Sequence, residues 1–309
     1  MSAGRSMQKP SQKLFGAICA LAGAGLWGLS NPFSKRILDQ GVDALEAAGL
    51  LYAGAAIGLA LLLGARAAVV RTRGAPVVRA DLKWLAAASI VGAAIAPFLM
   101  MYGQKHASGL AVSLLIAVEP PATALIAVAM FGERLTRRLV LGGMLVLAGV
   151  VLVGLKPGEG TDAATTTTLG ALAVASACTL WGLDSNLSTR VARLDPLFVA
   201  MMKGALAAPL VLLLALVLRG SPWWQHWTTR QAVEMLVIGF IGYGLGLALM
   251  VRAFRELGAA RVGALFASTS LFAAAGAVAL LGERPTLQLA YAALLLGAGV
   301  LTIVTEKHA

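Results

Sequence analysis

Three ionisable side chains lie deep inside long apolar stretches of the sequence: Glu119, Asp184 and Lys203. A charged group in the middle of a membrane costs about 2.5–3.5 kcal/mol on insertion scales, so such residues usually face a cavity or a partner. Glu119 precedes Pro120 and Pro121, which free backbone carbonyls around it. Two readings are open for Glu119: a cavity carboxylate that binds an amino group or carries a proton, or a protonated side chain bonded to a neighbouring helix.

Asp184 and Lys203 can form a buried pair between two helices or lie apart along a substrate path. The pair is favoured, because an unpaired buried charge is strongly disfavoured. If Glu119, Asp184 and Lys203 all face one cavity, its formal charge is −1. That mixed polarity suits a zwitterion or a weak cation better than a phosphate.

Aromatic and neutral polar side chains accompany these charges in the apolar stretches. Trp27 and Trp181 either wall a cavity, where they stack on a substrate or cation, or pack against small neighbours, and both readings are open. The predicted substrate-binding residues are Trp27, Ser30, Asn31, Tyr102, Glu119, Trp181, Asp184, Asn186, Lys203, Tyr243, Ser268 and Thr269.

The elements that must position these residues are membrane-spanning helices. Of 309 residues, 59% are hydrophobic and only 13% are charged, and the mean hydropathy is +0.83. A soluble chain carries about a quarter charged residues, whereas a bilayer accepts this much apolar surface. The net charge of +11 is explained by basic loops rather than by a nucleic-acid partner, so we expect a lipid bilayer and no nucleic acid.

Ten apolar stretches are long enough to cross a hydrocarbon core of about 30 Å. Their backbone groups must be satisfied internally, so each stretch is predicted to be a helix and the fold class is an all-α polytopic membrane protein. The predicted spans are 14–34, 44–65, 82–102, 108–131, 138–155, 169–190, 196–218, 233–251, 258–281 and 286–304.

The chain contains an internal repeat. Leu26–Leu29 and Leu180–Leu183 both read Leu-Trp-Gly-Leu, and they lie in the first and sixth spans. Phe131–Arg134 and Leu281–Arg284 share Gly-Glu-Arg, and each closes the fourth span of its half. The chain therefore consists of two units of five helices, and because five is odd, the units have opposite orientations in the membrane. Inverted repeats recur in secondary transporters, with substrate sites near the midplane.

Lysine and arginine counts predict the orientation, because cytoplasmic loops retain these residues. One set of alternate loops and the tails carry 17 of the 25, the opposite loops carry 7, and Lys203 lies inside a span. Both termini are predicted to be cytoplasmic, in a bacterial inner membrane. The predicted segments are a tail (1–13), a first repeat (14–155), a linker (156–168), a second repeat (169–304) and a C-terminal tail (305–309).

The ten spans, the Leu-Trp-Gly early in each half, Glu119-Pro120 in the fourth span and the doubled Gly-Glu-Arg resemble the EamA family of the drug/metabolite transporter superfamily. The resemblance covers nearly the whole chain. It implies ten helices around a central cavity, with the fifth helix of each half at the periphery, and export or exchange of amino acids, related metabolites or small drugs without ATP. One departure is Thr269-Ser270, which stands where the first half has Glu119-Pro120.

The sequence thus predicts a secondary transporter of a small-molecule substrate, working by alternating access, and leaves a coupling proton and a homodimer open. The alternative is a structural or channel-like membrane protein without transport function. No enzyme is expected, because neither Gly-x-Ser-x-Gly nor His-Glu-x-x-His occurs. No cofactor or metal is expected, and Cys19 and Cys178 are read as small apolar residues.

Other conspicuous residues are read as structural. Glu133 and Glu283 end spans and are predicted to cap helices or tie loops. Trp223, Trp224 and Trp227 are predicted to anchor at the headgroup layer, with a lid over the cavity as the alternative. Close helix approach is predicted at small residues, among them Gly242, Gly244 and Gly246.

Overall fold

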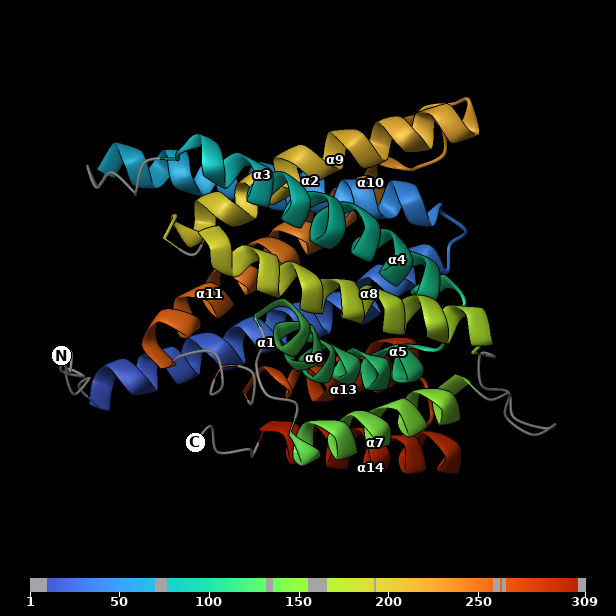
Figure 1. Cartoon of the computed structure of the whole chain (residues 1–309). Helices are drawn as coiled ribbons and strands as arrows, with labels where there is room; N and C mark the ends of the chain where they lie inside the picture. Colours follow the sequence, from blue (N-terminus) through green and yellow to red (C-terminus); the bar gives the residue numbers. More distant parts are fainter. Residues whose placement is uncertain are drawn as a thin grey trace, which may run out of the picture.

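The computed structural model describes residues 10–69, 77–131, 136–154, 166–191, 193–257, 262 and 265–304, and the regular structure in these ranges is helical (Figure 1). The helices of the first half are α1 (Pro10–Leu38), α2 (Ala44–Val69), α3 (Arg79–Ala88), α4 (Ala96–Lys105), α5 (Gly109–Leu115), α6 (Glu119–Phe131) and α7 (Arg137–Gly154). Those of the second half are α8 (Thr168–Ser188), α9 (Pro196–Arg219), α10 (Thr229–Ile238), α11 (Gly246–Leu257), α13 (Thr269–Leu281) and α14 (Leu287–Val304).

Short turns of other helix types join or extend these helices. The π-helical turns η1 (Ser89–Ile95) and η5 (Gly239–Leu245) join α3 to α4 and α10 to α11, at equivalent places in the two halves. The 3-10 turn η2 (Ile116–Val118) joins α5 to α6. Pro120 and Pro121 have no N–H to bond the carbonyls four residues back, so the helix tightens before Glu119. Two further 3-10 turns are η3 (Thr189–Val191) and η4 (Trp223–Gln225).

The membrane fold is confirmed, although the span count is not. Among the described residues, six helical segments are long and apolar enough to cross a membrane: Leu14–Leu38, Ala44–Ala68, Arg79–Lys105, Gly109–Met130, Pro196–Arg219 and Thr229–Ala253. Val140–Val153, Thr269–Leu281 and Leu287–Thr302 are shorter apolar helices. α8 is 21 residues long and coincides with the predicted span 169–190. The count of ten spans therefore stays a prediction.

Some predicted boundaries shift. α1 begins at Pro10, inside the predicted tail 1–13, and α8 begins at Thr168, the last residue of the predicted linker. α13 begins at Thr269, and Val262, Leu265 and Phe266 before it are also helical, while the predicted start of the ninth span at 258 lies outside the described residues. Most of the linker and most of both tails lie outside the described residues.

The two halves interlock. α1 packs chiefly against α11 and α13 of the second half, and α8 packs chiefly against α4 and α6 of the first. α2 packs on α9, while α7 packs on α14 at one edge of the molecule (Figure 1). Followed along the chain, α1 runs from left to right in Figure 1 and α8 from right to left. The first helices of the two halves thus point in opposite directions, as in an inverted repeat.

Glycines let these helices touch backbone to backbone. A Cβ built on Gly54 of α2 would lie 2.0 Å from the carbonyl oxygen of Leu236 in α10. A Cβ on Gly239, the first residue of η5, would lie 1.8 Å from the carbonyl oxygen of Leu51. A Cβ on Gly242 would lie 2.5 Å from Ser30 Cβ, so the prediction of close approach is confirmed at Gly242.

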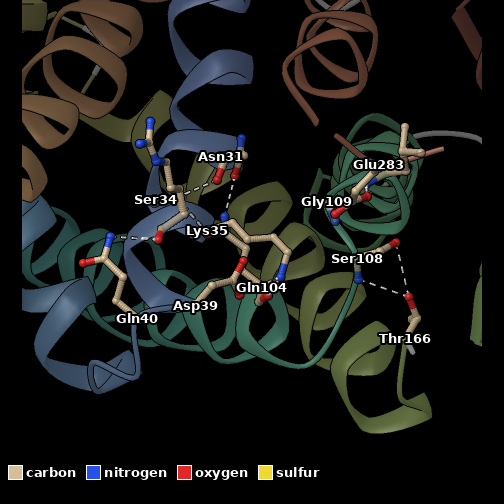
Figure 2. Close-up of polar contacts among 12 residues, drawn as sticks. Asn31, Ser34, Lys35, Asp39, Gln40, Gln104, Ser108, Gly109, Thr166 and Glu283 are labelled. Atoms are coloured by element: carbon tan, nitrogen blue, oxygen red, sulfur yellow. Dashed lines mark hydrogen bonds and ion pairs between the residues drawn. The ribbon is translucent and has the colours of Figure 1, made fainter. Parts of the chain in front are cut away.

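The Glu283 carboxylate caps a helix of the other half. Its Oε1 accepts a hydrogen bond from Gly109 N (2.6 Å) and its Oε2 accepts one from Leu110 N (2.7 Å), at the start of α5 (Figure 2). These N–H groups have no partner inside the helix, and a carboxylate also suits the positive end of the helix dipole. The predicted capping role is confirmed for Glu283, whereas Glu133 lies outside the described residues.

Replacing Glu283 with alanine should therefore lower stability by about 0.5–2 kcal/mol, the usual cost of a lost cap. Thermal unfolding of the purified protein in detergent would measure this loss. Glu234→Ala is the matched control, because Glu234 pairs with the exposed Arg230 in the same helix and such surface pairs contribute about 0.3–0.5 kcal/mol. Equal melting temperatures for the two variants would contradict the cap.

Candidate functional site

A small cavity of about 60 Å³ lies where helices of the two halves meet. Because the lining comes from α1, α2 and α6 on one side and from α8, α9, η5 and α11 on the other, neither half forms the cavity alone. The lining residues are Trp27, Tyr52, Glu119, Trp181, Asp184, Ser185, Lys203, Tyr243, Gly246, Leu247, Met250 and Phe266.

Glu119, the first residue of α6, lines this cavity. Its backbone carbonyl accepts a hydrogen bond from Thr123 Oγ1 (2.8 Å). Its carboxylate makes no hydrogen bond or ion pair with the residues that the structure describes. Of the two readings open from sequence, the cavity carboxylate fits this arrangement, because no neighbouring helix within the described ranges supplies a partner.

Asp184 and Lys203 form the buried pair that the sequence favours. Lys203 Nζ lies 2.6 Å from Asp184 Oδ1 and 2.8 Å from Asp184 Oδ2, and it also donates to Ser188 Oγ at 2.8 Å. The Lys203 side chain is 5% exposed and that of Asp184 is 13% exposed. Gly92 in η1 makes room for the pair, since a Cβ there would lie 2.2 Å from Asp184 Cγ. The pair ties α8 to α9, and Glu119 is the acidic residue of the lining that forms no ion pair with the described residues.

The two tryptophans of the repeated Leu-Trp-Gly meet each other at the cavity. The Trp27 and Trp181 ring centroids are 5.0 Å apart in an edge-to-face arrangement. Gly28 and Gly182, which follow them, each touch the backbone of the helix that they cross. Each ring lines the cavity and also packs against the other, so both sequence readings stay open for Trp27 and Trp181.

A backbone carbonyl of η1 holds the aromatic cluster in place. Gly92 O accepts hydrogen bonds from both Trp181 Nε1 and Tyr52 Oη, each at 2.9 Å. The Tyr243 ring lies 5.6 Å from Tyr52 and 6.1 Å from Trp27. The Tyr243 hydroxyl is buried and has no hydrogen-bond partner among the described residues. It is a polar group at the cavity that a bound molecule can satisfy.

Ser30 and Asn31 were predicted to contact substrate, but the structure places them in packing contacts outside the cavity lining. Ser30 Oγ donates to Trp27 O (2.6 Å). Asn31 Oδ1 accepts a hydrogen bond from Gln104 Nε2 (2.8 Å), and Ser34 Oγ donates to Gln104 Oε1 (2.8 Å). Figure 2 shows this network, in which Lys35 Nζ also donates to Gln104 O (2.9 Å). Ser30 of α1 corresponds in the repeat to Asp184 of α8. Its short neutral side chain packs against Gly242 of η5.

Four further predicted residues also lie outside the cavity lining. Asn186 donates to the carbonyls of Thr123 (3.1 Å) and Gly182 (2.8 Å), so it joins α8 to α6. The Tyr102 ring packs on His106 at 4.5 Å. Ser268 Oγ donates to the backbone carbonyl of Leu265, three residues earlier (2.6 Å). Thr269 is buried, and its backbone lies against Gly28 of α1.

Sequence reasoning missed six lining residues: Tyr52, Ser185, Gly246, Leu247, Met250 and Phe266. Tyr52 carried a usable signal, because it is one of four tyrosines in the chain and lies in an apolar span, as Tyr243 does. Leu247, Met250 and Phe266 carried none, since they are apolar residues among many. No group of three or more metal-ligating side chains occurs within the described ranges, and Cys19 and Cys178 are buried free thiols.

The tryptophan-rich loop of the second half does not act as a single interfacial anchor. Trp224 is 63% exposed, as an anchor would be. Trp227 instead is 6% exposed, and its Nε1 donates to Glu46 Oε2 at 2.9 Å. The anchoring prediction is wrong for Trp227, because the buried Glu46 at the start of α2 binds the indole N–H and draws the ring inward.

Comparisons with known proteins agree with this two-half architecture. An uncharacterized transporter of Methanothermobacter thermautotrophicus is 28% identical over 214 residues, which are 68% of this chain and 60% of that relative. The match therefore spans less than two thirds of the relative's length. A crystal structure shares the fold, with a TM-score of 0.59 and 23% identity over 96% of this chain and 97% of its own. The model of the EamA-like transporter family matches both halves, over residues 14–155 and 168–305. The chain belongs to the EamA-like transporter family.

Proposed function

We propose that the chain is a secondary transporter, exporting or exchanging small metabolites such as amino acids, related amines or small drugs. The observation that carries this proposal is the Glu119 carboxylate, which lies in a cavity between the two halves without a partner among the described residues. A site between oppositely directed repeats is the arrangement that alternating access uses, since rocking of one half against the other exposes the site to each side in turn. Membership of a transporter family supports the same conclusion.

In this proposal Glu119 binds the amino group of the substrate or a coupling proton, and exchanges them as the cavity opens to either side. Asp184 and Lys203 neutralise each other, so the formal net charge of the lining is −1 and belongs to Glu119. Ten helices cross a bacterial inner membrane with both termini in the cytoplasm, which the distribution of lysine and arginine supports. The mechanism requires one chain only, because one chain supplies the whole lining; a homodimer is compatible with it.

Counterflow in proteoliposomes tests the proposal. Vesicles loaded with a pool of amino acids and related amines should take up the same labelled compounds faster than empty vesicles, and uptake should saturate. Glu119→Gln should reduce exchange about tenfold or more and remove its pH dependence, because the amide carries neither charge nor proton. Glu234→Gln, a change at an exposed pair in α10, is the control and should leave exchange unaltered.

Two results would contradict the proposal. Equal affinity and equal pH dependence in Glu119→Gln, at equal expression, would remove Glu119 from the mechanism. Flux without saturation or trans-stimulation would indicate a channel-like protein instead of a carrier.

A further inference from the structure

The two tryptophans of the repeated Leu-Trp-Gly differ in how their indole N–H groups are bonded. Trp181 Nε1 donates to Gly92 O of η1 at 2.9 Å, whereas Trp27 Nε1 makes no hydrogen bond with the residues that the structure describes. Trp27 Nε1 is also not among the fully enclosed side-chain atoms that lack a partner in these ranges, so the nitrogen keeps some accessible surface. Because the Trp27 side chain is buried and lines the cavity, this surface faces the cavity. An indole N–H in such a place usually has a partner, and here a bound molecule can supply it.

The repeat offers Trp27 an equivalent acceptor that it does not use. Gly92 and Gly242 are each the fourth residue of their π-helical turns, η1 and η5. Their neighbours also correspond, since a Cβ built on Gly92 would meet Asp184 and one built on Gly242 would meet Ser30. The acceptor that corresponds to Gly92 O is therefore Gly242 O, to which Trp27 does not donate. The two halves thus share their backbone at this place and differ in the hydrogen bond.

A side-chain difference between the two π-helical turns accompanies this asymmetry. Tyr243 follows Gly242 in η5, whereas the small Ala93 follows Gly92 in η1. The Tyr243 ring lies 6.1 Å from the Trp27 ring, and both residues line the cavity. The Tyr243 hydroxyl is buried and has no partner in the described ranges. The cavity therefore holds two unused donors, an indole N–H from the first half and a phenol O–H from the second.

We infer that Trp27 Nε1 and the Tyr243 hydroxyl donate hydrogen bonds to an oxygen-bearing group of the substrate, a carboxylate or a carbonyl. The inference rests on the proposed function, and it assigns the residues that read this group. Trp181 does not take part as a donor, because Gly92 O already binds its N–H. An indole N–H donates and never accepts, so the assignment does not depend on the charge of any group in the cavity. The bound oxygen group joins the two halves, which is where a rocking carrier holds its substrate.

The first test needs no substrate and follows the indole protons of the purified full-length protein in detergent by NMR. Trp27→Phe and Trp181→Phe assign the two signals, because each variant loses one of them. In deuterated water the Trp27 proton should exchange about tenfold faster than the Trp181 proton, since only the latter is hydrogen-bonded. Equal exchange rates would overturn the inference, because Trp27 would then have a partner within the protein.

The second test compares three probes with one side chain and one amino group: valine has a carboxylate, valinamide a carbonyl, and isobutylamine neither. Equilibrium dialysis measures the binding of each labelled probe to the full-length protein. Trp27→Phe should lower the affinity for valine about tenfold and for valinamide about threefold, because the phenyl ring keeps the aromatic wall but lacks the N–H. The affinity for isobutylamine should change by less than about twofold. Tyr243→Phe should produce the same order of losses, and it provides a second variant if Trp27→Phe does not fold.

Two other tryptophans provide the controls. Trp181→Phe makes the same ring change in the same cavity and should alter the affinity for all three probes by one common factor. Trp224→Phe changes a tryptophan that is 63% exposed and should alter none of them. Equal losses for the three probes in Trp27→Phe, or no loss, would overturn the inference, as would binding of isobutylamine without valine or valinamide. Failure of the proposed function looks different, since no compound of the pool would then exchange in proteoliposomes while the two proton exchange rates would still differ.

Discussion

Replacing Gly239 with alanine should lower stability by about 3 kcal/mol, at the upper end of the cost of overpacking a core. The added Cβ would lie 1.8 Å from Leu51 O, and its other near neighbours are backbone atoms of the same residue. A backbone cannot turn aside as a flexible side chain does, so α2 must move away from η5. Helices in lipid are held together by close packing rather than by a hydrophobic force, so this separation is not compensated.

The measurement is thermal unfolding in detergent, where a loss of this size lowers the melting temperature by roughly 5–10 °C. Gly54→Ala should lower the melting temperature by a similar amount, because Gly54 of α2 lies against Leu236 O of α10 at the same helix crossing. Gly64→Ala lies in the same helix α2 as Gly54, and its Cβ meets nothing within 4 Å, so it serves as the control and should not destabilise. Equal melting temperatures for Gly239→Ala and Gly64→Ala would contradict the close backbone contact between Gly239 and Leu51.

Replacing Lys203 with methionine is expected to cost about 3–5 kcal/mol, because it leaves the Asp184 carboxylate in a largely buried site without its counter-charge. Asp184→Asn combined with Lys203→Met removes both charges, and this double variant should be more stable than Lys203→Met alone. The double-mutant cycle, again by thermal unfolding, isolates the coupling between the two side chains.

Arg230→Met provides the comparison for the Lys203 variant. Arg230 is 82% exposed and pairs with Glu234 one turn away, so its loss should cost no more than about 0.5 kcal/mol. If the double variant at 184 and 203 is as unstable as the sum of its single changes, the two side chains do not interact as the distances indicate.

Hydropathy and repetition were sufficient to predict the membrane fold and its two halves, since both are properties of long stretches. The Asp184–Lys203 pair was predictable for a similar reason, because two opposite buried charges in adjacent spans favour each other. The capping role of Glu283 followed from its position at the end of a span. In each case the chemistry of the residue restricts its environment.

The side chains that face the cavity were harder to predict. In a soluble protein the apolar face of a helix points inward, but a membrane helix is apolar toward both lipid and protein, so the pattern does not show which way a residue faces. Ser30 and Asn31 therefore looked as suitable as Glu119, and Met250 looked like any lipid-facing residue. The direction of a side chain in α1 depends on where η5 crosses it, and that crossing depends on glycines far away in the sequence, such as Gly242.

The first helix of each half packs chiefly against the other half. This arrangement affects the order in which helices can assemble during synthesis. The end of α1 at Leu38 precedes the start of α11 at Gly246 by 208 residues. At the usual rate of about 5–20 residues per second, the ribosome needs roughly 10–40 s to cover that distance. During this interval α1 lacks α11 and α13, its main neighbours, whereas Trp181, which contacts Trp27, is made before the interval ends. The first helix synthesised is thus among the last to gain its main contacts, and a nascent chain halted before α11 lacks those contacts.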